Sequence, residues 1–183
     1  MSMRLPDSRY EAIKQTIVDL FIRYDVNCVP INGFEIAAKM GIDVVPYSAY
    51  PPATQELLRK QSPDSFFVER WDGKTFIYHD TDPVYGRINQ SIMHEIGHIV
   101  LGHTQESELA EAEAKFFAKY ALAPPVLVHR VNPSDPYDLA ERFNISFQAA
   151  CIAWGYCRKW LAYSGKEYAS YEYQMLEQFQ LIG

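Results

Sequence analysis

Residues 94–98 read His-Glu-Ile-Gly-His, and the isoleucines around them recur at the spacing of an α-helix. On a helix, His94 and His98 are one turn apart and point from the same face, so they can hold one metal ion together. An apolar stripe on the other side would be formed by Ile88, Ile92, Ile96 and Ile99. Any fold of this chain must therefore bury the back of this helix and leave its front open to a site.

Glu95 lies one step round the same helix, where its carboxylate can take a proton from a water molecule on the metal. A catalytic zinc site has three protein ligands and keeps its fourth position open. Two of the ligands are His94 and His98, so the third must come from elsewhere in the chain. The motif predicts one Zn²⁺ per chain, with Glu95 as the catalytic base.

The next predicted helix, residues 107–122, carries three glutamates that are candidates for the third ligand: Glu108, Glu111 and Glu113. A helix that packs antiparallel to the motif helix can deliver one carboxylate and complete a set of two histidines and one glutamate. Geometry alone does not choose among the three, and the other two would form a solvated, acidic first turn. His103 is a further candidate, but it follows a helix stop and lies off the face of the motif histidines.

Three segments together resemble the ImmA/IrrE family of metallopeptidases. Residues 94–103 read His-Glu-Ile-Gly-His-Ile-Val-Leu-Gly-His, residues 111–118 read Glu-Ala-Glu-Ala-Lys-Phe-Phe-Ala, and residues 122–124 read Leu-Ala-Pro. The family pairs an HExxH helix with a Glu-x-Glu-Ala-Asn-x-Phe-Ala helix that ends in Leu-x-Pro. In that family the ligand lies four residues before the Asn or Asp, so the resemblance implies Glu111 as the third ligand and Glu113 as its outward neighbour.

The resemblance also implies an activity and a partner. Members of this family are often encoded beside helix-turn-helix repressors, which they cleave at one place, and many occur in phages and mobile elements. The chain is therefore expected to be a zinc-dependent endopeptidase that cleaves a helix-turn-helix transcriptional repressor in the cytoplasm. The alternative is a non-catalytic, metal-bearing regulator that binds a repressor or DNA.

Two positions depart from the family pattern. Lys115 stands where the family usually has Asn or Asp, a residue that would accept the spare N–H of a metal-bound imidazole. Lysine has no acceptor, so we expect another group to do this and Lys115 to be a solvated bystander. The other reading places Lys115 in the cleft, where its ammonium would favour deprotonated metal-bound water. The non-catalytic alternative takes its support from this change. Residues 89–90 are Asn-Gln where the family tends to carry Arg-Phe, and Arg87 is expected to hold the start of the helix instead.

The substrate side of the cleft is predicted from the strand at residues 75–79, which directly precedes the motif helix. Such a strand would form the rim of the cleft, and an extended substrate would pair with it as an added strand. A donor to the tetrahedral oxyanion is also required. The candidates are Tyr78, His79, His129 and Tyr137.

The rest of the pattern predicts an α+β fold. Two β-prone runs, residues 65–70 and 75–79, flank Trp-Asp-Gly-Lys, which is a strong hairpin signal. The expected fold is a small antiparallel sheet packed against the motif helix and its neighbours, with residues 1–132 as the metallopeptidase core and residues 133–183 as a helical C-terminal subdomain. Further elements are expected as a strand at 42–45 and helices at 8–24, 33–40, 54–60, 135–143, 146–162 and 168–181. The first two of these helices would be capped by a Ser8/Glu11 capping box and by Asn32.

Composition restricts the partners. The chain has 17 Lys and Arg against 23 Asp and Glu, a formal net charge of −6, which argues against nucleic acid as a partner. Residues 138–154 could form a helix-turn-helix, but its second helix nearly lacks side chains that contact DNA. An odd number of cysteines without CxxC spacing predicts reduced thiols and a cytoplasmic protein. We expect neither a membrane span nor a secretory signal, and the sequence specifies no oligomeric state.

Overall fold

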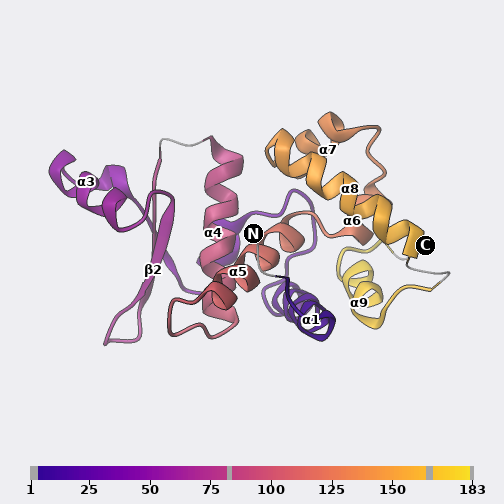
Figure 1. Ribbon diagram of the computed structural model, residues 1–183, viewed down its shortest axis with the longest axis horizontal. Helices are drawn as coiled ribbons and strands as arrows, with labels where there is room; N and C mark the ends of the chain where they lie inside the picture. Colours follow the sequence, from indigo (N-terminus) through magenta and orange to yellow (C-terminus); the bar gives the residue numbers. More distant parts are fainter. Residues whose placement is uncertain (1–3, 82–83, 164–166, 182–183) are drawn as a thin grey trace.

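The computed structural model describes residues 4–81, 84–163 and 167–181. It confirms the predicted α+β class, with a small sheet beside a set of helices (Figure 1). None of the helices within these residues combines the length and the apolar character needed to cross a bilayer. The elements in chain order are α1 (Asp7–Arg23), α2 (Gly33–Lys39), β1 (Asp43–Pro46), the 3-10 helix η1 (Tyr47–Ala49), α3 (Pro52–Gln61), β2 (Ser65–Glu69), β3 (Thr75–His79), α4 (Tyr85–Val100), α5 (Glu108–Leu122), α6 (Pro125–Val131), α7 (Pro136–Phe143), α8 (Phe147–Tyr163) and α9 (Ser170–Gln178).

The sheet is mixed rather than antiparallel, with the strand order β1-β3-β2. The predicted hairpin is present, because β2 and β3 pair antiparallel with Ser65 opposite His79. β1 joins the other side of β3 in parallel, with Asp43 opposite Phe76. The prediction was wrong for this strand because α3 and β2 carry the chain back between β1 and β3, and such a crossover allows parallel pairing.

The position of β3 also corrects the predicted rim of the cleft. β3 is the central strand, and its backbone is already paired with a neighbour on each side. A substrate strand cannot add there. β1 and β2 are the two edge strands, and only β2 contributes residues to the cleft, so the edge suited to strand addition is provided by residues 65–69.

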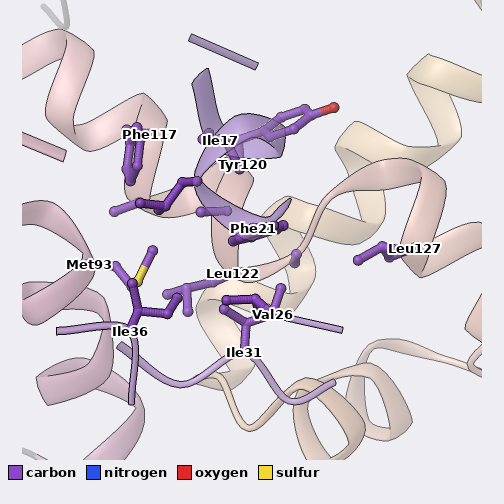
Figure 2. Packing of buried hydrophobic residues seen from close by; sticks show 14 of the residues in the cluster. Ile17, Phe21, Val26, Ile31, Ile36, Met93, Phe117, Tyr120, Leu122 and Leu127 are labelled. Atoms are coloured by element: carbon purple, nitrogen blue, oxygen red, sulfur yellow. The ribbon is translucent and has the colours of Figure 1, made fainter. Parts of the chain in front are cut away.

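The motif helix α4 packs most extensively against α5 in the described part of the chain. Gly97 permits this close approach, since a Cβ atom at that position would lie 3.0–3.2 Å from atoms of the Phe117 side chain. Ile92, Met93 and Ile96 are completely buried behind the motif, as the isoleucine stripe predicts. Figure 2 shows the core that these helices share with α1, α2 and α6.

The start of α1 and the presence of α6 differ from the predictions. Ser8 and Glu11 do not form a capping box, because α1 begins at Asp7 after Pro6, and Glu11 instead accepts a hydrogen bond from Lys14. Pro6 takes the N-cap position with an extended backbone, so the helix begins at Asp7 and Ser8 falls inside it. α6 was not predicted, since Pro124-Pro125 reads as a break; Pro125 sits in the first turn, where its missing N–H costs no hydrogen bond. The predicted cap at Asn32 is confirmed by hydrogen bonds from the backbone of residues 34 and 35.

The C-terminal helices pack back onto the first helix. α9 contacts α1 and α6, and α8 contacts α6 and α7. Asn132, with a left-handed φ of 49°, separates α6 from α7 at the point where the sequence suggests a subdomain boundary. Buried residues from both sides of this point, among them Leu127 and Leu139, belong to one hydrophobic cluster. The division into two subdomains stays a prediction.

Candidate metal centre

His94 and His98 of α4 and Glu111 of α5 meet with their ligand atoms facing one another. The Nε2 atom of His98 lies 3.1 Å from Nε2 of His94 and 3.1 Å from Oε1 of Glu111. The Nε2 atom of His94 lies 3.6 Å from Oε2 of Glu111. Ligand atoms around a tetrahedral zinc ion with bonds of about 2.0–2.1 Å are roughly 3.3 Å apart. The three residues therefore have the separations that a bound metal ion requires, and together they could hold one.

The protonation states of this group suit a divalent cation. Burial, with the neighbouring His98, lowers the pKa of His94 to about 4. Burial likewise lowers the pKa of His98. Burial acts to raise the pKa of Glu111, but the two histidines and Lys115 outweigh it and the pKa falls below its ordinary value. At neutral pH the group thus offers two uncharged imidazoles and one carboxylate, which are donors that a metal ion accepts directly.

Glu95 is buried beside this group and has its own hydrogen bonds. The hydroxyl of Ser65 donates a 2.6 Å hydrogen bond to Oε1 of Glu95, and the backbone of Phe67 provides a further one. Burial raises the pKa of Glu95 to about 7. A carboxyl group with a pKa near the operating pH can both accept a proton and return it, as a general acid–base catalyst must.

An open cleft with a volume of about 820 Å³ leads to these residues. One wall is the edge strand β2, and the floor is formed by α4 and α5. The loop after α4 and the turn between α7 and α8 complete it. The lining residues include Ser65, Phe66, Phe67, Gln90, His94, Glu95, His98, Thr104, Glu111, Lys115, Ser146 and Gln148.

The four predicted oxyanion donors, Tyr78, His79, His129 and Tyr137, are absent from the residues that line this cleft. His79 is buried, with its Nδ1 atom 2.8 Å from the carbonyl oxygen of Asp80. The other three pack against aromatic rings on β2 and α8. None of the four is therefore positioned to contact a group bound at the metal centre.

Glu113 differs from the outward neighbour that the family resemblance implies. Only 4% of its surface is exposed, and Arg9 of α1 donates two hydrogen bonds of 2.6 Å to its two carboxylate oxygens. The hydrogen bond from Arg9 holds the pKa of Glu113 below its ordinary value. Glu108, in contrast, is exposed at the start of α5, as a residue of a solvated first turn should be.

His103 lies outside the ligand group but touches it. Its Nδ1 atom is 2.9 Å from Nδ1 of His98, on the side of that imidazole away from Glu111, and its Nε2 atom is 2.9 Å from Oε2 of Glu113. His103 therefore supports a candidate ligand instead of being one. Sequence reasoning missed this role and also missed Arg9 and Ser65, which are remote in sequence from the motif and belong to no recognised pattern.

The structure shows the contacts of the residues at the two departures from the family pattern. Lys115 is largely exposed but lines the cleft, and its Nζ atom lies 3.4 Å from Oε2 of Glu111, so its role as a bystander stays a prediction. Arg87 pairs with Asp64 at 2.7 Å, so it ties the start of α4 to the segment before β2 as predicted. Asn89 is buried and bonds to the backbone of residues 31 and 33, which fixes α4 against the start of α2.

Comparison with known families gives one match. A peptidase family model described as IrrE N-terminal-like domain matches residues 46–154, which is more than half of the 183 residues. The matched range includes β2, β3, α4 and α5, and every residue that lines the cleft. Comparisons with curated proteins and with solved structures found no match.

Proposed function

Because this chain belongs to the IrrE N-terminal-like family of peptidases, we propose that it is a zinc-dependent endopeptidase that hydrolyses a peptide bond in a protein substrate. The observation that carries the proposal is the convergence of His94, His98 and Glu111 at metal-ligand distances, with Glu95 buried beside them in the same cleft. A peptidase family by itself implies only the class of reaction. The arrangement of these four side chains supports the specific chemistry.

Zinc is the metal that suits this donor set best. Two imidazoles and one carboxylate are a common set for catalytic zinc, which leaves one coordination position for water or substrate. We propose His94, His98 and Glu111 as the ligands of one zinc ion per chain. When bound, the ion would supply Lewis-acid chemistry, lowering the pKa of water and polarising the scissile carbonyl.

Glu95 is proposed as the general base and then the general acid. Its carboxylate accepts a proton from the attacking water, and it returns that proton to the leaving amine. Ser65 holds one carboxylate oxygen by a 2.6 Å hydrogen bond, which fixes the orientation of the group. Only 5% of the surface of Glu95 is exposed, and it lines the cleft in which the substrate would lie.

We propose that the substrate lies along β2 in an extended conformation. β2 is at the edge of the sheet, and its residues Ser65, Phe66 and Phe67 line the cleft. An added strand would bond to the free side of this backbone and place its own backbone over Glu95 and the metal ligands. A binding mode of this kind requires a segment that is unfolded or can unfold locally.

The substrate proposed here is a helix-turn-helix transcriptional repressor in the cytoplasm, on the strength of the family resemblance described above. Nucleic acid is not part of this proposal, since the chain is acidic overall. The gene adjacent to the one that encodes this chain is the first place to look for the repressor.

The test combines metal content with cleavage of that repressor. Wild-type protein should contain about one zinc ion per chain and cut the repressor at one site, while Glu95→Gln should keep the zinc and lose cleavage. His94→Ala and His98→Ala should lose zinc, and Glu111→Ala should bind it much more weakly. A Glu95→Gln variant that still releases the repressor from its operator would contradict the peptidase and favour the non-catalytic regulator.

A further inference from the structure

We propose that His103, Glu113 and Arg9 form a hydrogen-bonded chain that positions His98 as a metal ligand, so that helix α1 contributes to metal affinity. The inference rests on the proposed function, because it takes His98 to be a ligand. It assigns positioning roles to three residues, none of which binds the metal. The chain runs from α4 through the loop after it to α5 and then to α1.

The first link is fixed by the chemistry of imidazole. A neutral histidine that gives Nε2 to a metal carries its proton on Nδ1, and that N–H needs an acceptor. The Nδ1 atom of His98 lies 2.9 Å from Nδ1 of His103. His103 can accept this hydrogen bond only if its own proton is on Nε2, so the first link determines the tautomer of the second histidine.

The second link agrees with that tautomer. The Nε2–H group of His103 points to Oε2 of Glu113 at 2.9 Å, and a carboxylate is an acceptor. Each imidazole thus donates to the next member, and no member is left with two donors or two acceptors facing each other. Both imidazole hydrogen bonds therefore run away from the metal ligands, and Glu113 is the final acceptor.

Arg9 completes the chain at its outer end. Its Nε and Nη2 atoms donate to Oε1 and Oε2 of Glu113, both at 2.6 Å. A buried carboxylate without a partner would be costly, and the bidentate pair supplies both the compensating charge and a fixed plane. Glu113 is consequently held in one orientation, with Oε2 toward His103.

Local backbone geometry brings His103 back to the helix that it follows. Gly102 has a φ of +70°, a left-handed conformation that ends α4 and reverses the chain. The backbone N–H of His103 then bonds to the carbonyl of His98 at 3.0 Å. Two contacts therefore join the same pair of residues, one through the backbone and one through the rings.

Arg9 lies outside the matched family region, which begins at residue 46. It is 104 residues from Glu113 in sequence, and α1 is anchored in the core by Ile13 and Ile17. The peptidase-like region by itself would leave Glu113 buried without its cation. Helix α1 is for this reason a part of the metal centre as well as of the core.

The test measures zinc affinity of the full chain by competition with a chromophoric chelator. His103→Phe keeps a ring but removes the acceptor, Glu113→Gln removes the charge, and Arg9→Leu removes the partner of Glu113. Each should weaken zinc binding by about 10–100-fold, as loss of support behind a metal ligand does. Arg9→Lys keeps the charge but loses the planar, bidentate fit to the carboxylate, and it should weaken zinc binding less than Arg9→Leu.

Matched control variants change exposed residues in α5 and just before α1. Glu108→Gln changes an exposed glutamate of α5, and Arg4→Gln changes the exposed arginine that pairs with Asp7 just before α1. Both should bind zinc as the wild type does. Cobalt substitution gives a second readout: the visible absorption of bound Co²⁺ should change in His103→Phe, because the orientation of His98 changes, and stay the same in the controls.

The outcomes separate this inference from the proposed function. If the wild type binds about one zinc ion and His103→Phe and Glu113→Gln bind it within twofold as tightly, the positioning chain is wrong and the peptidase proposal stands. If the wild type binds no zinc, both are wrong. Should His103→Phe fail to fold, as judged by circular dichroism of the metal-free protein, Glu113→Gln and Arg9→Lys decide the question.

Discussion

The hydroxyl of Ser65, at the beginning of the edge strand β2, donates a 2.6 Å hydrogen bond to the carboxylate of Glu95 on α4. Both residues are buried, with 8% and 5% of their surfaces exposed. The bond joins the strand that would bind a substrate to the residue that would move the proton. The position of the proposed base is thus set relative to the substrate-binding edge and not by its own helix alone.

Ser65→Ala should lower kcat about tenfold and leave KM and zinc content unchanged. The loss of one hydrogen bond to a charged group corresponds to about 1.5 kcal/mol, or a factor of ten in rate. Steady-state cleavage of the repressor measures both constants. Ser62→Ala, at another serine that lines the cleft, is the control and should behave as wild type. An unchanged kcat in Ser65→Ala would mean that the bond does not orient the base.

Glu95→Gln should stabilise the metal-free protein in a pH-dependent manner. Burial raises the pKa of Glu95 to about 7, above its ordinary value of 4.5, so the folded state holds this proton more tightly than the unfolded state. The stabilisation of the wild type from this proton is complete below pH 4.5 and is lost as the pH rises through about 7. Glutamine does not titrate, so the variant has no such loss of stability between pH 4.5 and 7.

The free energy of unfolding of the variant should therefore exceed that of the wild type by an amount that grows between pH 4.5 and 7 and reaches about 2–3 kcal/mol. Urea unfolding of chelator-treated protein at several pH values measures the difference. A difference that stays constant with pH would contradict the origin assigned to the shift.

Gly97→Ala should destabilise the fold by about 1–3 kcal/mol and weaken zinc binding. The added methyl group would lie 3.0 Å from the buried ring of Phe117, so α4 and α5 must move apart, and Glu111 moves with α5. Gly155→Ala is a matched control, because a Cβ atom there would meet no other atom within 4 Å. Thermal unfolding and chelator competition should show lower stability and weaker zinc binding in Gly97→Ala and not in Gly155→Ala. If the two variants behave equally, the close approach of α4 and α5 does not depend on Gly97.

Lys115→Asn should keep or increase peptidase activity. The exposed ion pair of Lys115 with Glu111 contributes little, and asparagine would offer an acceptor near His94, while His103 already serves Nδ1 of His98. Lys119→Asn, one turn further along α5 and also exposed, serves as the control. Cleavage rates on the repressor decide the matter, and a large loss confined to Lys115→Asn would assign the lysine a direct part in the reaction.

Local patterns predicted most of the elements. The isoleucine stripe and the Asp-Gly turn gave α4 and the β2–β3 hairpin, since helical periodicity and turn chemistry depend only on nearby residues. The parallel pairing of β1 could not be predicted, because it depends on where the chain returns after α3. Residue spacing placed two histidines together, while the choice of Glu111 needed the family resemblance.

The residues that support the site could not be predicted either, because their contacts join segments that are far apart in the sequence. The pairs Arg9–Glu113 and Ser65–Glu95 join residues 104 and 30 positions apart, and neither leaves a periodic signal in the sequence. The family resemblance implies an outward position for Glu113, and no nearby residue in the sequence indicates a buried partner. The burial of its carboxylate is explained only by the arginine that reaches it from α1.

Helix α3 buries none of its residues and is joined to the sheet by the side chains of Arg59 and Asp80. Figure 1 shows it projecting beyond the sheet, away from α9. Its last residue, Gln61, and the segment after it nevertheless form part of the cleft wall. Substitutions at exposed positions of α3 other than Arg59 should accordingly cost little free energy of folding, and at Gln61 they would change the side chain that the cleft presents without disturbing the candidate ligands beneath it.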